Sequence, residues 1–277
     1  MPDIKADEQV LQQHYLKCYE TVKSDRFFAI YAQEKIRHSW QVVGAGNYIM
    51  RHETDFHNRN ADFLRYAKLA YLFHDIGRFK EITLSFANPG QQYDHGLFGY
   101  EILKSMPEYA VPEILLPVKH HGRMIEELYS DPDFADIDDL KLRSDIEKII
   151  FLVRDADKIA NFNLLRNSIK KADTHIFDLF MCGLPDAELS SQTVEDFKDI
   201  QIVRKKDIAS VADNLLYYLS WTFDMNYKSS FDFCIKTGSF KTLFEVLNNY
   251  NPDKKLQKEL EKNFQNYIEY RYQQFKG

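Results

Sequence analysis

The segment Tyr71-Leu72-Phe73-His74-Asp75-Ile76-Gly77-Arg78 places two polar side chains at the end of an apolar helical run. Burying His74 and Asp75 there costs free energy unless each side chain has a partner. A transition-metal ion would be such a partner, because imidazole nitrogens and carboxylate oxygens together suit these metals. Taken alone, the pair is more simply explained as a capped helix end with a hydrogen-bonded histidine. The rest of the chain must therefore decide between the two interpretations.

The composition is that of an ordinary soluble globular protein. The chain has 277 residues, 44% apolar and 28% charged, which is enough for one large domain or two smaller ones. Ten glycines and eight prolines are too few for a β protein with many turns. The net charge is −6 and no long run of lysine and arginine occurs, so we expect no duplex nucleic acid as a partner.

The cysteines and the apolar segments bear on the location of the protein. Three widely spaced cysteines, Cys18, Cys182 and Cys234, form neither a metal-binding spacing nor a disulfide framework, which fits a reducing compartment. The N-terminus has no apolar signal sequence, and no window approaches 18 uninterrupted apolar residues. We therefore expect a cytoplasmic protein that does not associate with membranes.

Apolar residues recur at the helical period of 3.6 in almost every segment, and convincing alternating strands are absent. The expected fold class is therefore all-α. No linker divides the chain clearly. Residues 1–185 carry the polar residues discussed below, and we expect residues 186–277 to form a C-terminal helical extension packed on the same domain.

Local signals predict where several helices begin and end. Ser24 is expected to cap a long helix that runs to about residue 50, and Asn60 is expected to cap the next one. Gly77 supplies the backbone freedom to end that second helix. Pro112 suits the first position of a later helix, because proline lacks the N–H group that would be unsatisfied there.

The middle of the chain contains further capping signals. Asp94 is a plausible N-cap for a short helix, and this is the simplest explanation of its presence. Ser144 and Glu147 have the spacing of a capping box and predict the start of another helix. The acidic segment 130–139 is interpreted as a solvated loop.

Two further polar residues interrupt apolar helix faces. His38 recurs at helical spacing with Val42, Ala45 and Ile49, although a lone histidine in such a stripe is commonly a hydrogen-bonded core residue. Asp157 lies on the apolar face of a later helix, where a core residue would be expected. Asp155 lies on a neighbouring face, so periodicity favours Asp157 only modestly.

The unusual polar residues share two properties: each comes from a different helix or helix end, and each has strongly apolar neighbours. In chain order they are His38, His74-Asp75, His95, His120-His121 and Asp157. Helical bundles build metal sites by projecting ligands inward from facing helices. The joint pattern therefore favours a metal site over a set of unrelated structural histidines.

With these residues in this order, residues 24–169 resemble the HD-domain superfamily of metal-dependent phosphohydrolases. Its hallmark is a histidine, a His-Asp pair and a terminal aspartate, and a subset adds two histidines between them. The resemblance implies an all-α bundle, with residues 1–185 forming the HD-type metal-binding domain and its core at about 24–169.

The resemblance also implies a ligand set. The first metal would be held by His38, His74, Asp75 and Asp157. The second would be held by His95 and His120, with Asp75 bridging the two. Asp155 is an alternative to Asp157, and His121 could replace or supplement His120.

The ligand types permit several cofactors. Histidine and carboxylate ligands suit one or two divalent transition-metal ions, with iron, manganese, nickel, cobalt and zinc all compatible. Ligation without cysteine disfavours a structural zinc cluster. The substrate class and the number of ions are not specified by the residues.

The implied activity is hydrolysis of a phosphate ester or anhydride, on a small phosphorylated substrate such as a nucleotide. Metal ions lower the pKa of bound water, and cations balance the charge on phosphoryl oxygens. Lys35, Arg78 and Lys158 are the candidate phosphate-binding residues, and Asp75 is the central catalytic carboxylate. Asp94 could orient a water molecule or protonate the leaving group, which competes with its capping role.

Two other functions stay open. Similar six-residue sets occur in HD-type diiron oxygenases, and a degenerate HD module could act as a non-catalytic, metal-binding regulatory domain. The presence of every expected ligand argues against degeneracy. Assembly into a homo-oligomer is compatible with the sequence.

Overall fold

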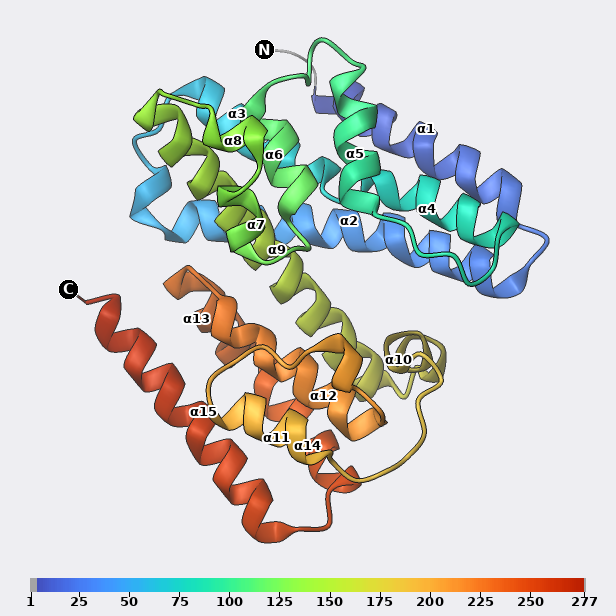
Figure 1. Cartoon of the computed structure of the whole chain (residues 1–277), viewed down its shortest axis with the longest axis vertical. Coiled ribbons are helices and arrows are strands. Elements are labelled where there is room, and N and C mark those ends of the chain that lie inside the picture. Colours follow the sequence, from blue (N-terminus) through green and yellow to red (C-terminus); the bar gives the residue numbers. More distant parts are fainter. Residues whose placement is uncertain (1–3, 277) are drawn as a thin grey trace. The chain divides into compact units, whose positions relative to one another are not determined.

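The computed structural model describes residues 4–276, which contain helices and no strand, so the expected all-α class is confirmed. The helices up to α9 are α1 (Ile4–Val22), α2 (Arg26–His52), η1 (Thr54–Phe56), α3 (Ala61–Phe73), α4 (Ile76–Ala87), α5 (His95–Lys104), α6 (Pro112–His120), α7 (Ile125–Tyr129), α8 (Pro132–Ala135) and α9 (Leu140–Lys171). Figure 1 shows them in chain order. No helix of the described residues is long and apolar enough to cross a membrane.

The remaining helices follow α9. They are α10 (Thr174–Met181), α11 (Ser191–Lys198), η2 (Lys205–Asp207), α12 (Val211–Ser220), η3 (Trp221–Asp224), α13 (Lys228–Thr237), α14 (Ser239–Tyr250) and α15 (Lys254–Gln274). Figure 1 shows α15 as the long helix that ends the chain.

The chain divides into two compact units, Met1–Ala160 and Asn161–Gly277. The division falls within α9, whereas the sequence suggested a boundary near residue 185. The last turns of α9 belong with the later helices, since the Phe162 ring lies 5.4 Å from the ring of Phe240. Packing of the C-terminal extension on the first domain stays a prediction.

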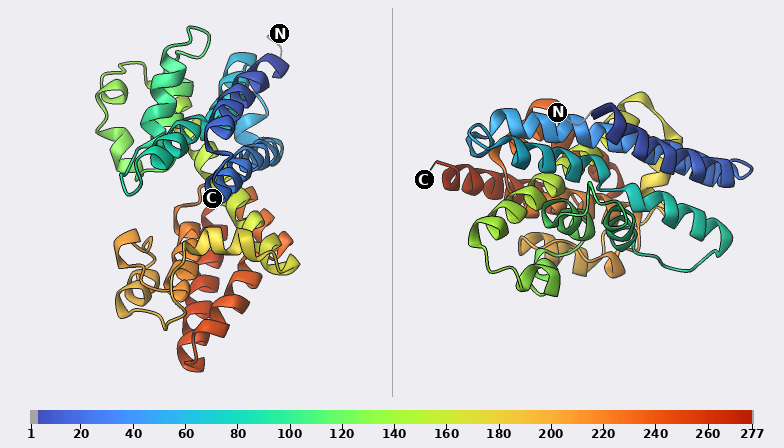
Figure 2. Two further views of the ribbon diagram at one scale, coloured as in Figure 1. Left: turned by 90° about the vertical axis from the view of Figure 1, so that its right-hand side faces the viewer. Right: turned by 90° about the horizontal axis from the view of Figure 1, so that it is seen from above.

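In the first unit, α1, α2 and α4 lie side by side (Figures 1 and 2). Further contacts join α3 to α6, α4 to α5, and α5 to α6. Their apolar faces bury a common core that includes Leu11, Ile36, Leu72, Phe73 and Val118. The apolar end of α3 is thereby buried on all sides, which carries the residues that follow it into the interior.

The second unit has an aromatic core. The ring of Phe197 lies 5.0 Å from that of Phe223, and the ring of Phe264 lies 5.0 Å from Phe240 and 5.2 Å from Phe244. These rings come from α11, η3, α14 and α15, so aromatic packing holds the helices of this unit together.

The start of α2 differs from the prediction. Asp25, and not Ser24, is its N-cap, and its carboxylate accepts hydrogen bonds from the backbone N–H groups of Phe27 (2.9 Å) and Phe28 (3.1 Å). A carboxylate also complements the positive end of the helix dipole, which a hydroxyl does not. Asn60 is confirmed as the N-cap of α3, accepting from the third residue beyond it at 2.8 Å.

Two other capping predictions are confirmed. Asp94 caps α5 through a hydrogen bond from the backbone N–H of Leu97 at 3.0 Å. Pro112 begins α6. Both residues satisfy or remove donors that would otherwise lack partners at a helix start.

The start of α9 was predicted wrongly, because Ser144 and Glu147 lie inside the helix and form no capping box at its start. Asp139 supplies the cap one turn earlier, accepting from the backbone N–H groups of Lys141 (2.8 Å) and Leu142 (3.2 Å). An aspartate placed earlier in the chain thus begins the helix before the serine is reached.

The acidic segment 130–139 is also not simply a solvated loop. It contains the short helix α8, and Asp131 caps that helix by accepting from the backbone N–H of Asp133 at 3.0 Å. Asp131 is buried. Its carboxylate pairs with side chains of α6 that are described below.

Gly77 has a different role from the one predicted. The break follows Phe73, and α4 begins at Ile76, so Gly77 lies in the first turn of α4. A Cβ at Gly77 would overlap the backbone oxygen of His95 and the backbone nitrogen of Gly99. The missing side chain therefore lets α4 and α5 approach closely, and this brings His95 towards the break.

Replacing Gly77 by Ala should destabilise the protein by about 2–3 kcal/mol, because two backbone segments must move apart. Gly44→Ala is the matched control, since Gly44 is exposed in α2 and no atom lies within 4 Å of the added Cβ. The control should gain about 0.5–1 kcal/mol from helix propensity. Urea unfolding of both variants measures these changes, and equal stability of the two would contradict the close approach.

Candidate metal centre

The break between α3 and α4 positions the central pair. His74 follows the last residue of α3 and Asp75 precedes the first residue of α4, and both side chains are buried. Unlike Asp25, Asn60 and Asp94, the Asp75 side chain makes no capping hydrogen bond. The interpretation as a merely capped helix end therefore does not hold, and the carboxylate is directed elsewhere.

A first group of potential ligands comprises His38 from α2, His74, and Asp157 from α9. His38 Nε2 lies 2.8 Å from Asp157 Oδ1, and His74 Nε2 lies 3.9 Å from the same oxygen. Burial opposes ionisation of Asp157, but the hydrogen bond and charge of His38 hold the pKa of Asp157 below its ordinary value. The group thus joins three helices around a carboxylate.

The protonation of His74 is fixed by its neighbour. Its Nδ1 lies 2.9 Å from the carbonyl oxygen of Tyr71, which can only accept, so Nδ1–H donates. Burial lowers the pKa of His74 to about 4, so the ring is neutral at neutral pH. Nε2 is then a buried lone pair with no hydrogen-bond partner, and it faces oxygens of Asp75 and Asp157. The lone pair and the carboxylate oxygens repel each other, and a cation between them would remove this repulsion.

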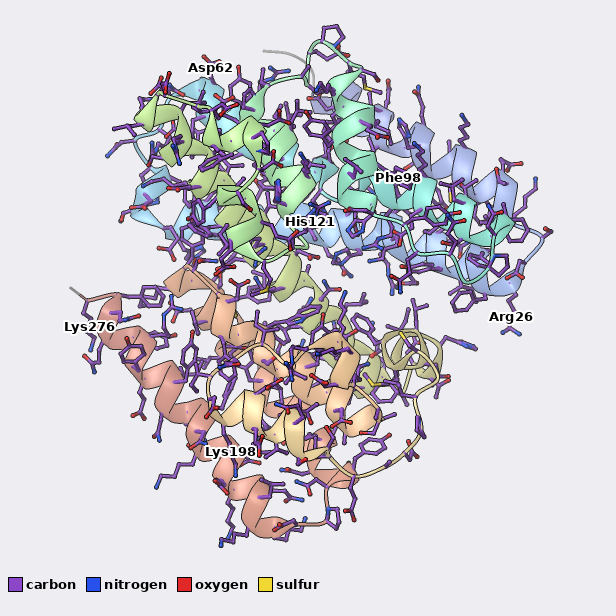
Figure 3. The ribbon with its side chains drawn as sticks, viewed as in Figure 1. Arg26, Asp62, Phe98, His121, Lys198 and Lys276 are labelled. Atoms are coloured by element: carbon purple, nitrogen blue, oxygen red, sulfur yellow. The ribbon has the colours of Figure 1, made fainter. Side chains whose placement is uncertain are left out.

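A second group comprises Asp75, His95 at the start of α5, and His121, which follows the last residue of α6 (Figure 3). His121 Nδ1 donates to the carbonyl oxygen of Val118 at 2.8 Å, which leaves Nε2 as the acceptor nitrogen. The Nε2 atoms of His95 and His121 lie 3.2 Å apart. Backbone carbonyls thus fix one histidine in each group, as is usual for metal-binding histidines.

Asp75 contacts both groups with different oxygens. Its Oδ2 lies 3.7 Å from His74 Nε2, whereas its Oδ1 lies 3.4 Å from His95 Nε2 and 3.6 Å from His121 Nε2. One carboxylate therefore lies between two sets of histidine nitrogens. The donor set and the buried lone pairs fit divalent transition-metal ions, and each group has ligand atoms close enough together that it could hold one.

Two cations accompany Asp75. Lys35 Nζ lies 3.3 Å from Oδ2, and Arg78 Nε lies 3.6 Å from Oδ1. Burial opposes ionisation, but Lys35 and Arg78 hold the pKa of Asp75 well below its ordinary range. The structure thus brings two of the three predicted phosphate-binding residues beside the metal groups.

His120 lies outside both groups, and His121 takes the place expected of it. His120 Nε2 lies 2.6 Å from Asp131 Oδ2, and Lys119 Nζ lies 2.6 Å from the same oxygen. Consecutive residues of a helix project about 100° apart, so two adjacent histidines cannot both face one point. The pairing with Asp131 explains why His120 faces α8.

Arg154 was not singled out by the sequence, although it supports His121. From α9 its Nη1 donates to the carbonyl oxygens of His121 (3.2 Å) and His120 (3.4 Å), and also to that of Arg123. These carbonyls lie at and just beyond the end of α6, where helical hydrogen bonding stops, and the His120 carbonyl also accepts from the backbone N–H of Arg123 at 3.1 Å. A buried guanidinium satisfies them and fixes the position of His121.

Glu81 was also missed. Its Oε2 lies 2.5 Å from Arg78 Nη1 and 3.7 Å from His95 Nδ1, so it belongs to the surroundings of the second group. The spacing could have revealed it, because Glu81 follows Arg78 by three residues on the same face of α4.

The other candidates are not members of the two groups. Asp155 is fully buried and belongs to neither group, and Lys158 is buried in α9 one residue after Asp157. Asp94 caps α5 and pairs with Arg123, and these partners lower the pKa of Asp94 although burial opposes this. Catalytic roles for Lys158 and Asp94 stay predictions.

Residues 36–161 match the model of the HD-domain family, which agrees with the resemblance that the sequence shows over this part of the chain. Both potential ligand groups, from His38 to Asp157, lie inside the match. The HD superfamily consists largely of metal-dependent phosphohydrolases that bind divalent metals. No curated protein and no solved structure gave a significant match to the chain.

Substitution of the two adjacent histidines separates their roles. His121→Gln should weaken binding of one metal ion more than about 100-fold, since even the loss of an outer partner costs up to that much. His120→Gln should leave the metal content unchanged and cost about 1–3 kcal/mol, because the buried Asp131 loses a partner. Metal analysis and urea unfolding test this; metal loss in the His120 variant alone would reverse the assignment.

Proposed function

We propose that this chain is a metal-dependent phosphohydrolase that cleaves a phosphate ester or anhydride of a small metabolite, such as a nucleotide. The supporting observation is the position of Asp75, whose two carboxylate oxygens face different groups of histidine nitrogens. A carboxylate shared in this way suits a site with two metal ions. The match of residues 36–161 to the HD-domain family, which consists largely of metal-dependent phosphohydrolases, supports the reaction class.

We propose the following ligands. His38, His74 and Asp157 would hold one ion, His95 and His121 would hold the other, and Asp75 would be shared between them. When bound, such ions stabilise charge on phosphoryl oxygens and lower the pKa of water near neutrality.

The chain's own cations would bind the substrate. Lys35 and Arg78 contact Asp75 from α2 and α4, so a phosphoryl group at the metal centre would lie within their neighbourhood. Arg78 is permanently charged, and its planar guanidinium can donate two parallel hydrogen bonds to phosphate oxygens. Fixed positive charges stabilise the transition state of phosphoryl transfer most when they lie beside the phosphoryl oxygens on which negative charge develops.

The direct test is a screen of activity. The protein should be purified without chelator, its metals quantified, and a panel of nucleotides and phosphoesters assayed with and without oxygen. We expect phosphate release that does not depend on oxygen and stops when a chelator is added. Oxygen-dependent turnover with two irons would instead support an HD-type oxygenase. Bound metal without any turnover would support a regulatory module.

Asp75→Ala tests the shared carboxylate. We expect loss of both metal ions and of phosphate release, by at least about 1,000-fold, because one residue serves both groups. Glu101→Gln is the control, since Glu101 is exposed in α5 and contacts only Lys80 among the ion pairs described, at 3.5 Å. A metal-loaded, active Asp75→Ala protein would show that the site lies elsewhere.

A further inference from the structure

Arg78 is largely buried and directly contacts the second group. Its guanidinium contacts three residues of the second group and its surroundings. Nε lies 3.6 Å from Asp75 Oδ1, Nη1 lies 2.5 Å from Glu81 Oε2, and Nη2 lies 2.8 Å from His95 Nε2. Arg78 therefore spans from the shared carboxylate to a histidine nitrogen.

The contact with His95 fixes the proton on that ring. A guanidinium has only donors and stays charged, so His95 Nε2 must accept with its lone pair. The ring proton is then on Nδ1, which lies 3.7 Å from Glu81 Oε2. The lone pair that Arg78 occupies is the one on the nitrogen nearest to His121 Nε2 and Asp75 Oδ1, where a metal would bind.

We propose that Arg78 takes the place of the second metal ion in the metal-free protein, and that this ion binds only when the guanidinium leaves His95. The inference rests on the metal binding of the proposed function. Glu81 is the residue that positions Arg78 in this state, since it follows one turn later in α4 and contacts both Arg78 and His95.

Charge balance explains why Arg78 is there without metal and would move with it. Among the described ion pairs, Lys35 and Arg78 are the lysine and arginine side chains that contact Asp75. A divalent ion a few ångströms from a guanidinium would repel it strongly in a buried site. Arg78 is then released from His95, and the Nη2 donor that contacted the ring becomes available to an anionic substrate. Metal loading thus prepares the phosphate-binding residue.

In the first group, no lysine or arginine contacts a histidine nitrogen among the hydrogen bonds described. His74 Nε2 has no hydrogen-bond partner, and Lys35 contacts an oxygen of Asp75 and not a histidine nitrogen. Two classes of affinity follow, with the first group binding more tightly. If the Arg78 guanidinium contacts His95 in about 90% of the molecules, the apparent affinity of the second group for its metal ion is weakened about tenfold.

The test is Mn²⁺ binding to the full chain, measured by equilibrium dialysis. The variant Arg78→Gln/Glu81→Gln removes the guanidinium and its counter-charge together, so no freed carboxylate attracts the metal. We expect the weaker class to tighten about tenfold or more while the stronger class changes little. Arg78→Gln alone should tighten it at least as much.

Lys35→Gln is the matched control for charge. It removes one positive charge beside Asp75 Oδ2, the oxygen that faces His74, without changing a histidine contact, so it should tighten the first class at least as much as the second. A selective gain in the Arg78 variants supports competition. Unchanged or weaker second-class binding in both Arg78 variants, or the same selective gain in the Lys35 variant, would overturn it.

A measurement on the unmodified protein removes dependence on how the variants fold. In ¹⁵N spectra the Arg78 guanidinium should be protected from exchange without metal and should lose protection when Zn²⁺ fills the second class. Protection that persists at two bound ions would overturn the inference alone. Failure of the unmodified protein to bind Mn²⁺ or Zn²⁺ would overturn the proposed function as well.

Discussion

The buried carboxylate of Asp75 is the constraint on which the rest of the centre depends. Its Oδ2 faces a histidine nitrogen of the first group, and its Oδ1 faces histidine nitrogens of the second group. Among the ion pairs described, Lys35 and Arg78 are the lysine and arginine side chains that contact it. Removing a carboxylate from water is costly unless cations and donors compensate. The same compensation makes the position attractive to divalent metal ions, which bring more charge than either side chain.

Several features of the fold hold this carboxylate in place. The interruption between α3 and α4 turns His74 and Asp75 inward, and Gly77 lets the start of α5 come close enough for His95 to reach. At the end of α6, Arg154 satisfies the backbone carbonyls around His121. Each feature uses a backbone end or a missing side chain, which is how a helical bundle places ligands accurately without strands.

The sequence predicted the helical class and most of the residues that the structure brings together in the two groups, because helical periodicity reveals polar residues on apolar faces. His38 and Asp157 were found in this way and are brought together by the structure. The choice between His120 and His121 depended on Asp131, whose burial no local pattern indicated. Glu81 was overlooked because a carboxylate near an arginine on a helix usually forms a surface pair. Contacts with the next helical segment, which periodicity within one helix does not reveal, decided both cases.

The central claim is that Asp75 is shared between two metal ions. Anomalous diffraction from crystals grown with Mn²⁺ tests this most directly, because it locates each ion independently of activity. We expect two peaks flanking the Asp75 carboxylate, one beside His74 and the other beside His95 and His121. A single peak that Asp75 does not contact, or two peaks elsewhere, would contradict the claim.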